Sequence, residues 1–440
     1  MSIKDSAWIL SNSNKLCPRL KRYALQWYRP SRLTPCFMQK IERNIKVRWR
    51  KLPVILQLEN LEAAAMSVND LNSLTGCRVK RKLSLINSIS IEVNEKQLKE
   101  LVKNANVKKI WYDSEVRAVV DAASATVKAP ELWEMGLTGK GVVIAVLDTG
   151  IYEHPDLVGR ITGFKDFIGS RSEPYDDNGH GTHVAGCAAA NGSQASDYKG
   201  PAPEAELVGI KVLDKMGAGS LSTVIDGIQW CIQQKDELMI RVINLSLGSE
   251  AYQSFRDDPV CQAVEKAWYS GIVVCAAAGN SGPDKGTIGS PGIDPVIITV
   301  GASNDRSSPD PAGNKVADFS SRGPSIDGLV KPDVLAPGVD IVSLRAPNSF
   351  LDKSNKNARV GSWHISLSGT SMATPVCAGV TAQLLQSEGS LTPEQVKEML
   401  MLNATKIPGV DSNSQGAGVI DGHKAVIQPP VEMEEANPLL

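Results

Sequence analysis

A serine at the start of a predicted helix is the first residue in this chain that could do chemistry. Residues 368–375 read Ser-Gly-Thr-Ser-Met-Ala-Thr-Pro, a glycine-containing loop that leads into a helix expected from 372 to about 386. Pro375 would lie in the first turn of that helix, where its missing N–H costs nothing. Ser371 would lie at the positive end of the helix dipole, which suits a group that develops negative charge during a reaction. Helix capping is the alternative role for a serine at this place.

Three more polar side chains follow predicted strands or open a predicted helix. Asp148 ends an apolar run, His180 opens a helix of small residues, and Asn280 follows another apolar run. The carboxyl ends of parallel strands meet at one edge of a sheet, so these side chains could meet Ser371 there. The serine would supply a hydroxyl, the imidazole would take its proton, the carboxylate would orient the imidazole, and the amide would donate to an oxyanion. Taken singly, the aspartate or the asparagine could also form an ordinary turn.

The motifs around these residues resemble those of the subtilisin family of serine proteases, the subtilases. They read Val-Leu-Asp-Thr-Gly at 146–150, His-Gly-Thr-His-Val-Ala-Gly at 180–186 and Gly-Thr-Ser-Met-Ala-Thr-Pro at 369–375. The order Asp, His, Ser is that of subtilisin itself. The resemblance covers about residues 129–426 and implies a serine endopeptidase of broad specificity that works through an acyl-enzyme intermediate.

Residue by residue, the resemblance implies Asp148 as the orienting carboxylate, His180 as general base and then acid, Ser371 as nucleophile, and Asn280 as oxyanion donor. It also makes His183 similar to a structural histidine of the family, outside the catalytic set. No zinc site is expected from the two histidines, since neither Glu nor Cys accompanies them at ligand spacing.

Two other classes of protein compete with a protease. A catalytically silent scaffold with this fold would only bind peptides, but it would lack a catalytic or oxyanion residue, and all four are present. An α/β-hydrolase esterase would have the order Ser, Asp, His and the pattern G-x-S-x-G. Here the order is reversed, and Ala373 holds the place of the last glycine.

The resemblance also implies a peptide-binding cleft and a specificity pocket. Two segments would offer backbone groups to an extended peptide by strand addition, and a glycine would form the floor of the main pocket, leaving room for a large apolar side chain. Turn geometry is the alternative explanation for the glycines. The residues concerned are Gly217, Ala218, Gly219, Ser246, Leu247, Gly248 and, in the pocket, Gly289.

The order of elements predicts an α/β fold for residues 121–426. Continuous apolar runs at 142–147, 207–212, 242–247, 272–278 and 296–300 alternate with helical segments. Runs of this kind are typical of strands buried on both faces of a parallel sheet. The prediction is a doubly wound, mainly parallel, subtilisin-like sheet flanked by helices.

The N-terminal part predicts a separate small domain. Residues 53–120 follow the order β-α-β-β-α-β, with a helix at 63–74, as in a small α+β ferredoxin-like domain. This domain resembles the propeptide that assists folding of subtilases and inhibits them through its C-terminal tail. The protein's own N-terminal domain is thus an expected partner, with a cut expected around 118–121.

Both ends of the chain are expected to lie outside these domains. Residues 1–51 contain thirteen Lys or Arg against two acids, a net charge of +11. Residues 1–52 are therefore expected to form a solvated or loosely docked basic extension. Contact with nucleic acid is the less favoured alternative, because no recognised motif accompanies the charge. A C-terminal tail is expected at 427–440.

Composition limits the compartment and the cofactors. Hydrophobic residues make up 42%, charged residues 22%, and the net charge is −1. The sequence has no apolar run of signal-peptide or membrane-span length, and eight cysteines without paired spacing, so a cytoplasmic protein with reduced thiols is expected. No cofactor is expected for catalysis. The resemblance allows a structural calcium ion with Asp156 as one ligand, although residues 191–199 do not reproduce the rest of such a site.

Overall fold

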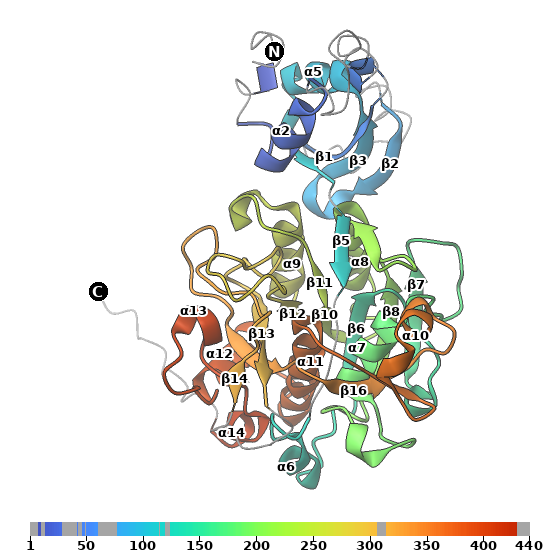
Figure 1. The fold of residues 1–440 in the computed structure, drawn as a ribbon, viewed down its shortest axis with the longest axis vertical. Coiled ribbons are helices and arrows are strands. Elements are labelled where there is room, and N and C mark those ends of the chain that lie inside the picture. The colour runs from blue at the N-terminus through green and yellow to red at the C-terminus, as the bar shows by residue number, and fades with distance from the viewer. Residues whose placement is uncertain are drawn as a thin grey trace.

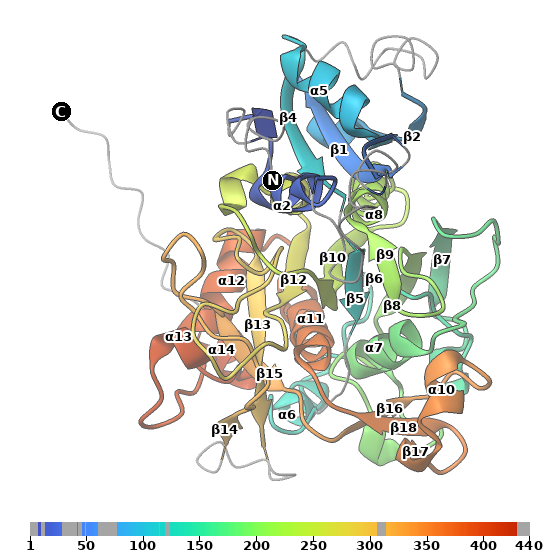
Figure 2. The same cartoon turned by 45° about the horizontal axis from the view of Figure 1, so that its top comes forward.

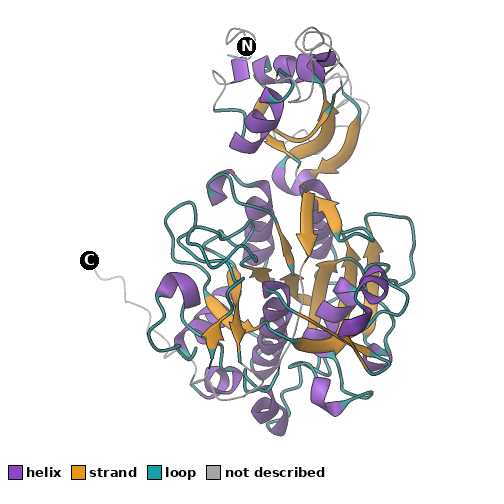
Figure 3. Cartoon of the chain, viewed as in Figure 1, coloured by secondary structure: helices purple, strands orange, loops and turns teal. Residues whose placement is uncertain are grey.

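The structure is a computed structural model that describes residues 8–9, 14–28, 42, 46–48, 50–59, 77–113, 115–118, 124–305 and 314–428. It has a small lobe, formed by the N-terminal part of the chain, and a larger α/β lobe (Figure 1). Loops join the helices and strands of the larger lobe along its whole surface (Figure 3). No helix in the ranges just given is both long and apolar enough to cross a membrane.

An eight-stranded sheet forms the centre of the larger lobe, in the order β14-β13-β12-β10-β6-β8-β7, with β15 also paired to β13. Neighbouring strands are parallel except β14, which runs antiparallel to β13. Because successive strands add first to one side of β6 and then to the other, the sheet is doubly wound, as predicted. The strands are β6 (Val143–Asp148), β7 (Ile161–Asp166), β8 (Glu206–Lys211), β10 (Ile240–Leu245), β12 (Val273–Ala277), β13 (Ile298–Asn304), β14 (Lys315–Val316) and β15 (Val334–Pro337).

Helices cover this sheet, and every residue of its strands β6 and β12 is buried. Helices α7 and α11 pack against each other, whereas α8 and α9 lie side by side next to the small lobe (Figure 2). A separate sheet of three short antiparallel strands, β16 (Ile341–Leu344), β18 (His364–Leu367) and β17 (Arg359–Val360), packs on α7. The helices of the larger lobe are α6 (Ala129–Glu134), α7 (His180–Ala189), α8 (Leu221–Gln233), α9 (Pro259–Tyr269), α10 (Phe350–Ser354), α11 (Thr370–Ser387), α12 (Pro393–Leu402), α13 (Ser412–Gln415) and α14 (Gly422–Ile427).

Helix α11 starts earlier than predicted. Its first residue is Thr370 and its N-cap is Gly369, so Ser371 is already the second helical residue. Pro375 therefore lies inside the helix, in its second turn, and the expected first-turn position is wrong. A proline there removes one hydrogen bond to the carbonyl four residues earlier, which is the carbonyl of Ser371.

The small lobe contains a four-stranded antiparallel sheet in the order β2-β3-β1-β4, which is the strand order of a ferredoxin-like sheet. Helix α5 (Glu95–Lys103) packs on β3 and β4 and starts with a capping box between Asn94 and Gln97. The helix predicted at 63–74 lies outside the described residues. The strands are β1 (Leu52–Leu58), β2 (Val79–Leu83), β3 (Ser88–Val93) and β4 (Val107–Tyr112).

Part of the basic N-terminal segment belongs to the small lobe. Leu16 forms a parallel bridge with Ile110 of β4, and helix α2 (Pro18–Leu25) follows directly. The side chains of Leu20 and Trp27 are fully buried. The expectation of a solvated or loosely docked extension up to residue 52 is therefore wrong for residues 14–28, because their apolar side chains fill the core of this lobe.

Candidate active site

Asp148 and His180 form a buried pair at the carboxyl end of β6. Nδ1 of His180 lies 2.6 Å from Oδ1 of Asp148, and both side chains are almost completely buried. The same carboxylate oxygen accepts the N–H of Thr149 at 2.7 Å. A carboxylate at Nδ1 places the proton on that nitrogen and leaves the lone pair on Nε2. The imidazole thus has the tautomer that a general base needs.

A close approach between α7 and the end of β6 makes this pair possible. A side-chain carbon added at Gly181 would lie 2.0 Å from the carbonyl oxygen of Gly150, so only glycine fits. Gly150 itself has a φ of +116°, a conformation that glycine adopts without strain. The first turn of α7 can therefore rest directly on the strand end.

Asp176 is a supporting residue that the sequence did not indicate. Its buried carboxylate accepts hydrogen bonds from the hydroxyls of Thr149 and Thr182 and from the N–H of Gly179. The N–H of Gly181 in turn donates to the Thr149 hydroxyl at 2.9 Å. Burial raises the pKa of Asp176, and the hydrogen bonds from Thr182 and Gly179 oppose the rise. Asp176 thereby ties the start of α7 to the end of β6.

Ser371 lies at the start of α11, where a side chain outside the helix donates a hydrogen bond to its main-chain carbonyl. The carbonyl of Ser371 cannot accept the usual helical bond from residue 375, because residue 375 is proline. The hydroxyl of Ser246 donates to that carbonyl instead, and it accepts a hydrogen bond from Nδ2 of Asn244. The side chain of Ser246, expected at the substrate cleft, therefore supports the main chain of Ser371.

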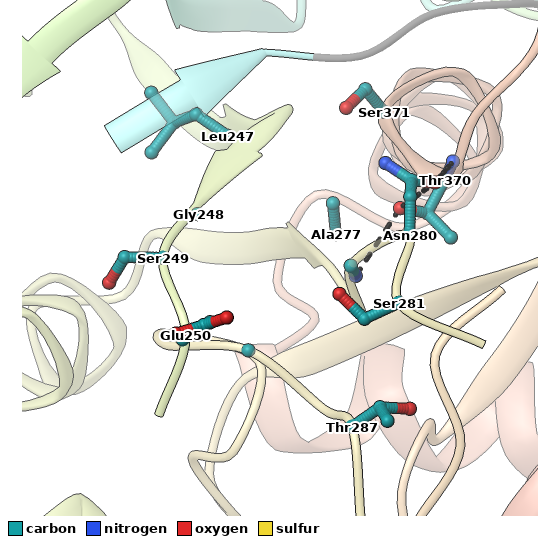
Figure 4. A pocket seen from close by; sticks show the side chains of 12 residues that line it. Leu247, Gly248, Ser249, Glu250, Ala277, Asn280, Ser281, Thr287, Thr370 and Ser371 are labelled. Atoms are coloured by element: carbon teal, nitrogen blue, oxygen red, sulfur yellow. Dashed lines mark hydrogen bonds between the residues drawn. The ribbon is translucent and has the colours of Figure 1, made fainter. Parts of the chain in front are cut away.

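Asn280 lies beside Ser371 with a defined amide orientation (Figure 4). Its Oδ1 accepts the backbone N–H of Thr370 at 2.8 Å and the Thr370 hydroxyl at 3.2 Å. The Thr370 hydroxyl also accepts the N–H of Gly279 at 3.3 Å. Since the N–H and the hydroxyl of Thr370 both face Oδ1 of Asn280, its Nδ2 group is the one that can donate toward Ser371.

A pocket opens next to Ser371 and contains the glycine predicted for its floor. A side-chain carbon added at Gly289 would lie 2.8 Å from the carbonyl of Ser249, which pairs with Ser290. Glycine is thus required both for space and for this backbone contact. The pocket has a volume of about 280 Å³ and is lined by Leu247, Gly248, Ser249, Glu250, Ala277, Gly279, Asn280, Ser281, Thr287, Gly289, Thr370 and Ser371.

The two predicted cleft segments pair with a strand from the N-terminal part of the chain. Strand β5 (Glu115–Ala118) lies between β11 (Leu247–Gly248) and β9 (Ala218–Ser220) and is antiparallel to both. Val116 pairs with Gly219 and Arg117 pairs with Gly248. Gly217 lies just before β9 with a φ of +73°. The cut expected around 118–121 falls largely outside the described residues.

His183 is not part of this site. It is completely buried, and its Nε2 lies 3.1 Å from the carbonyl oxygen of Ile365, to which it donates. Burial, together with the nearby His180, lowers the pKa of His183 to about 3, so the ring is neutral. A structural role agrees with this environment.

The carboxylate of Asp156, which the resemblance suggested as a calcium ligand, has one oxygen that accepts hydrogen bonds and one that does not. Its Oδ1 accepts hydrogen bonds from the Ser193 hydroxyl at 2.7 Å and from the N–H of Gln194 at 2.9 Å. Its Oδ2 is buried and has no hydrogen-bond partner among the described residues, whereas a complete calcium site requires six to eight oxygen ligands. The described part of the chain also contains no group of three or more His, Cys, Asp or Glu side chains that could hold a metal ion.

The fold and the site are those of a serine protease, and comparison with known proteins identifies the family. Residues 139–418 match the Subtilase family, and the chain belongs to that family. It is similar to serine protease AprX of Bacillus subtilis (strain 168), with 45% identity over 95% of this chain and 97% of the relative. Subtilisin E of the same organism is 36% identical over 80% of this chain and 84% of its own length. A thermostable alkaline protease of Halalkalibacterium halodurans is 35% identical over 81% of this chain and 87% of its own length.

These similarities establish the activity. The protein is a serine-type endopeptidase that hydrolyses peptide bonds of proteins and peptides. Nothing in the sequence or the site favours a catalytically silent scaffold.

Proposed function

We propose that Ser371, His180, Asp148 and Asn280 carry out the hydrolysis. The support is geometric: a buried imidazole–carboxylate bond of 2.6 Å at the end of β6, and an amide beside Ser371 whose Oδ1 is already occupied. The ordered Asp148–His180 pair is the observation on which this proposal rests most directly.

The reaction follows from these positions. Nε2 of His180 takes the proton of the Ser371 hydroxyl as Oγ attacks the carbonyl carbon of the peptide, and a C–O bond forms. The oxyanion accepts hydrogen bonds from Nδ2 of Asn280 and from the N–H of Ser371 at the start of α11. His180 then gives its proton to the leaving nitrogen as the C–N bond breaks. Water repeats these steps on the acyl-enzyme and restores the serine.

Kinetics of single and double variants test these roles. Ser371→Ala and His180→Ala should each lower kcat by several orders of magnitude, and the double variant should be no slower than the slower single variant, because the two groups act as one unit. Matched losses with little change in KM support the assignment. If the double variant instead lost the product of the two single effects, Ser371 and His180 would act independently and the proposed unit would be wrong.

We further propose that substrates bind by adding a strand between β9 and β11. Both strands form ladders with β5, so the edges that β5 occupies match the hydrogen-bonding pattern of an extended peptide main chain. Main-chain recognition of this kind accepts many sequences, which agrees with broad specificity.

The strand that occupies this cleft leads to a proposal on regulation. We infer that β5 and the small lobe act as an intramolecular inhibitor and folding aid, since a substrate would have to displace β5 from β9 and β11. The parallel sheet needs many long-range pairings, which form slowly, and a docked template would help them.

Several polar contacts hold the small lobe in this position. Asp113 caps the start of α8 by accepting from the N–H of Ser222 at 3.0 Å and from its hydroxyl at 2.6 Å. Arg81 forms an ion pair of 2.9 Å with Asp226 of α8 and donates to the carbonyl of Phe167. These contacts place the small lobe on α8, directly above β5.

We propose no cofactor for catalysis, because the serine mechanism needs none. We also propose a cytoplasmic location. All seven described cysteines are buried thiols, the state that a reducing compartment maintains.

A further inference from the structure

A carboxylate lies in the lining of the pocket that holds Ser371. Glu250 follows β11 by two residues, and its side chain extends from that segment toward the opposite wall of the pocket, which carries Ser281 (Figure 4). Glu250 is exposed to solvent, as expected for a charged group at the wall of an open pocket. Glu250 takes no part in the proposed catalytic steps.

The pocket has the position and size to receive one substrate side chain. It opens beside Ser371 and Asn280, and its walls near Gly289 are backbone only. A cavity of about 150 Å³ already binds benzene. The volume of about 280 Å³ therefore holds a long side chain. Given the proposed roles of Ser371 and Asn280, that side chain belongs to the residue before the cleaved bond.

The polar groups of the pocket are unequally engaged. The Thr287 hydroxyl donates to the carbonyl of Asp284 and accepts the N–H of Arg322. By contrast, neither the Glu250 carboxylate nor the Ser281 hydroxyl has a hydrogen-bond or ion-pair partner in the part of the chain that the structure describes.

The guanidinium of Arg322, whose backbone contacts Thr287 of the pocket, is bound to other groups. Arg322 approaches the pocket only through its backbone, since its guanidinium donates to the carbonyls of Ser320 and Ala317. Since no cation among the described side chains engages this carboxylate, the pocket wall carries a negative charge. A substrate side chain with a positive end would therefore meet an acceptor there.

We propose that Glu250 makes this endopeptidase select lysine or arginine before the cleaved bond. The long apolar stem of such a side chain would lie between the backbone walls, and its charged end would reach Glu250, with the Ser281 hydroxyl as a second acceptor. The glycine floor alone predicted a large apolar side chain. The carboxylate changes that preference to a large basic side chain. This inference rests on Ser371 as the proposed nucleophile and adds Glu250 as a residue that determines substrate specificity.

Paired peptides test the proposal on the full-length protein. Two peptides would differ only before the scissile bond, one with lysine and one with norleucine, which has a similar length and no charge. The wild-type protein should have a kcat/KM about tenfold higher for the lysine peptide, the effect of one charge-assisted contact at a partly exposed site. The ratio does not depend on the fraction of active protein, so partial inhibition by the small lobe leaves it unchanged.

Variants separate the effect of Glu250 from other causes. Glu250→Gln should bring the ratio close to one, and Glu250→Lys should favour norleucine, whereas Glu237→Gln, the same change at an exposed site beyond α8, should leave the ratio unchanged. Raising the salt concentration should lower the wild-type ratio, because an exposed charge pair is screened. A ratio that stays the same in Glu250→Gln, in protein that still hydrolyses both peptides, would overturn the selection but not the proposed function. If the wild-type protein hydrolysed neither peptide, that result would instead count against the proposed function.

Discussion

The hydroxyl of Ser246 donates a hydrogen bond to the main-chain carbonyl of Ser371, to which Pro375 cannot donate the usual helical bond. The end of β10 thereby fixes the first turn of α11 from outside the helix. The backbone N–H of Ser371, which we propose as an oxyanion donor, depends on the same turn. A proline in the second turn is thus compatible with a precisely held serine.

Removal of this bond should destabilise the protein. Ser246→Ala leaves the buried carbonyl of Ser371 and the amide of Asn244 without their partner, at a cost of about 1–3 kcal/mol in the free energy of unfolding. Urea unfolding measures this cost, with Ser371→Ala as the background so that self-digestion does not interfere.

A second substitution checks the cause. Pro375→Ala returns an N–H to the carbonyl of Ser371, so Ser246→Ala should cost less in that background, with a coupling energy of at least about 0.5 kcal/mol. Strictly additive costs would show that the Ser246 hydroxyl does not substitute for the missing helical bond.

Asn280→Asp should slow catalysis without unfolding the site. Aspartate keeps the oxygen that accepts from Thr370 but loses the donor and adds a negative charge beside the oxyanion. We expect kcat to fall by at least about 10²-fold with little change in KM, a magnitude that comes from subtilisin itself. A change confined to KM would mean that Asn280 binds the ground state and does not stabilise the oxyanion.

The sequence indicated the proposed reactive groups more directly than the groups that support them. Contiguous motifs contain Asp148, His180, Ser371 and Asn280. Each motif indicates both the residue and the helix or strand that carries it. The acceptor role of Asn280 toward Thr370 joins residues 90 positions apart, and only the tertiary fold brings them together. The position of Pro375 inside α11 was missed for a related reason, since the hydrogen bond to the carbonyl of Ser371 comes from Ser246, 125 residues before Ser371.

The packing of α2 could have been predicted. The buried residues Leu16, Leu20, Ala24 and Trp27 recur at the spacing of one helical face, which indicates a helix packed on a core. The strong positive charge of the segment concealed this pattern, because charge and an apolar face can occupy the same helix.

Acid should destabilise the protein through His154. Burial lowers the pKa of His154 to about 4, against an ordinary value of about 6.5, so the folded protein holds it neutral. At pH values above 6.5 both folded and unfolded states are neutral at this residue, and its contribution to stability is complete. As the pH falls from 6.5 to about 4, the unfolded state binds the proton first and up to about 3 kcal/mol is lost.

His154→Gln checks that contribution in the Ser371→Ala background. The free energy of unfolding, measured by urea titration at pH 7 and pH 4.5, should fall less in His154→Gln than in the parent. An equal fall in the two proteins would place the acid sensitivity at other groups.

Weakening the dock of the small lobe should raise the activity of the full-length protein. Arg81→Ala leaves Asp226 largely buried without its cation, so the lobe should detach more readily and the initial rate of peptide hydrolysis should rise by up to about tenfold, or 1.4 kcal/mol. Lys80→Ala is the matched control, because Lys80 pairs with Glu92 at an exposed position within the small lobe. Equal rates in the two variants would argue against inhibition by this lobe.

Reaction with a fluorophosphonate probe tests the central assignment most directly, because such probes label only an activated serine. Full-length wild-type protein, incubated until its peptide hydrolysis is steady, should incorporate one probe, and peptide mapping should locate it on Ser371. His180→Ala should label far more slowly, and Ser371→Ala should not label. Labelling of Ser371→Ala at the wild-type rate, or a wild-type protein that cleaves peptides without labelling, would contradict Ser371 as the nucleophile.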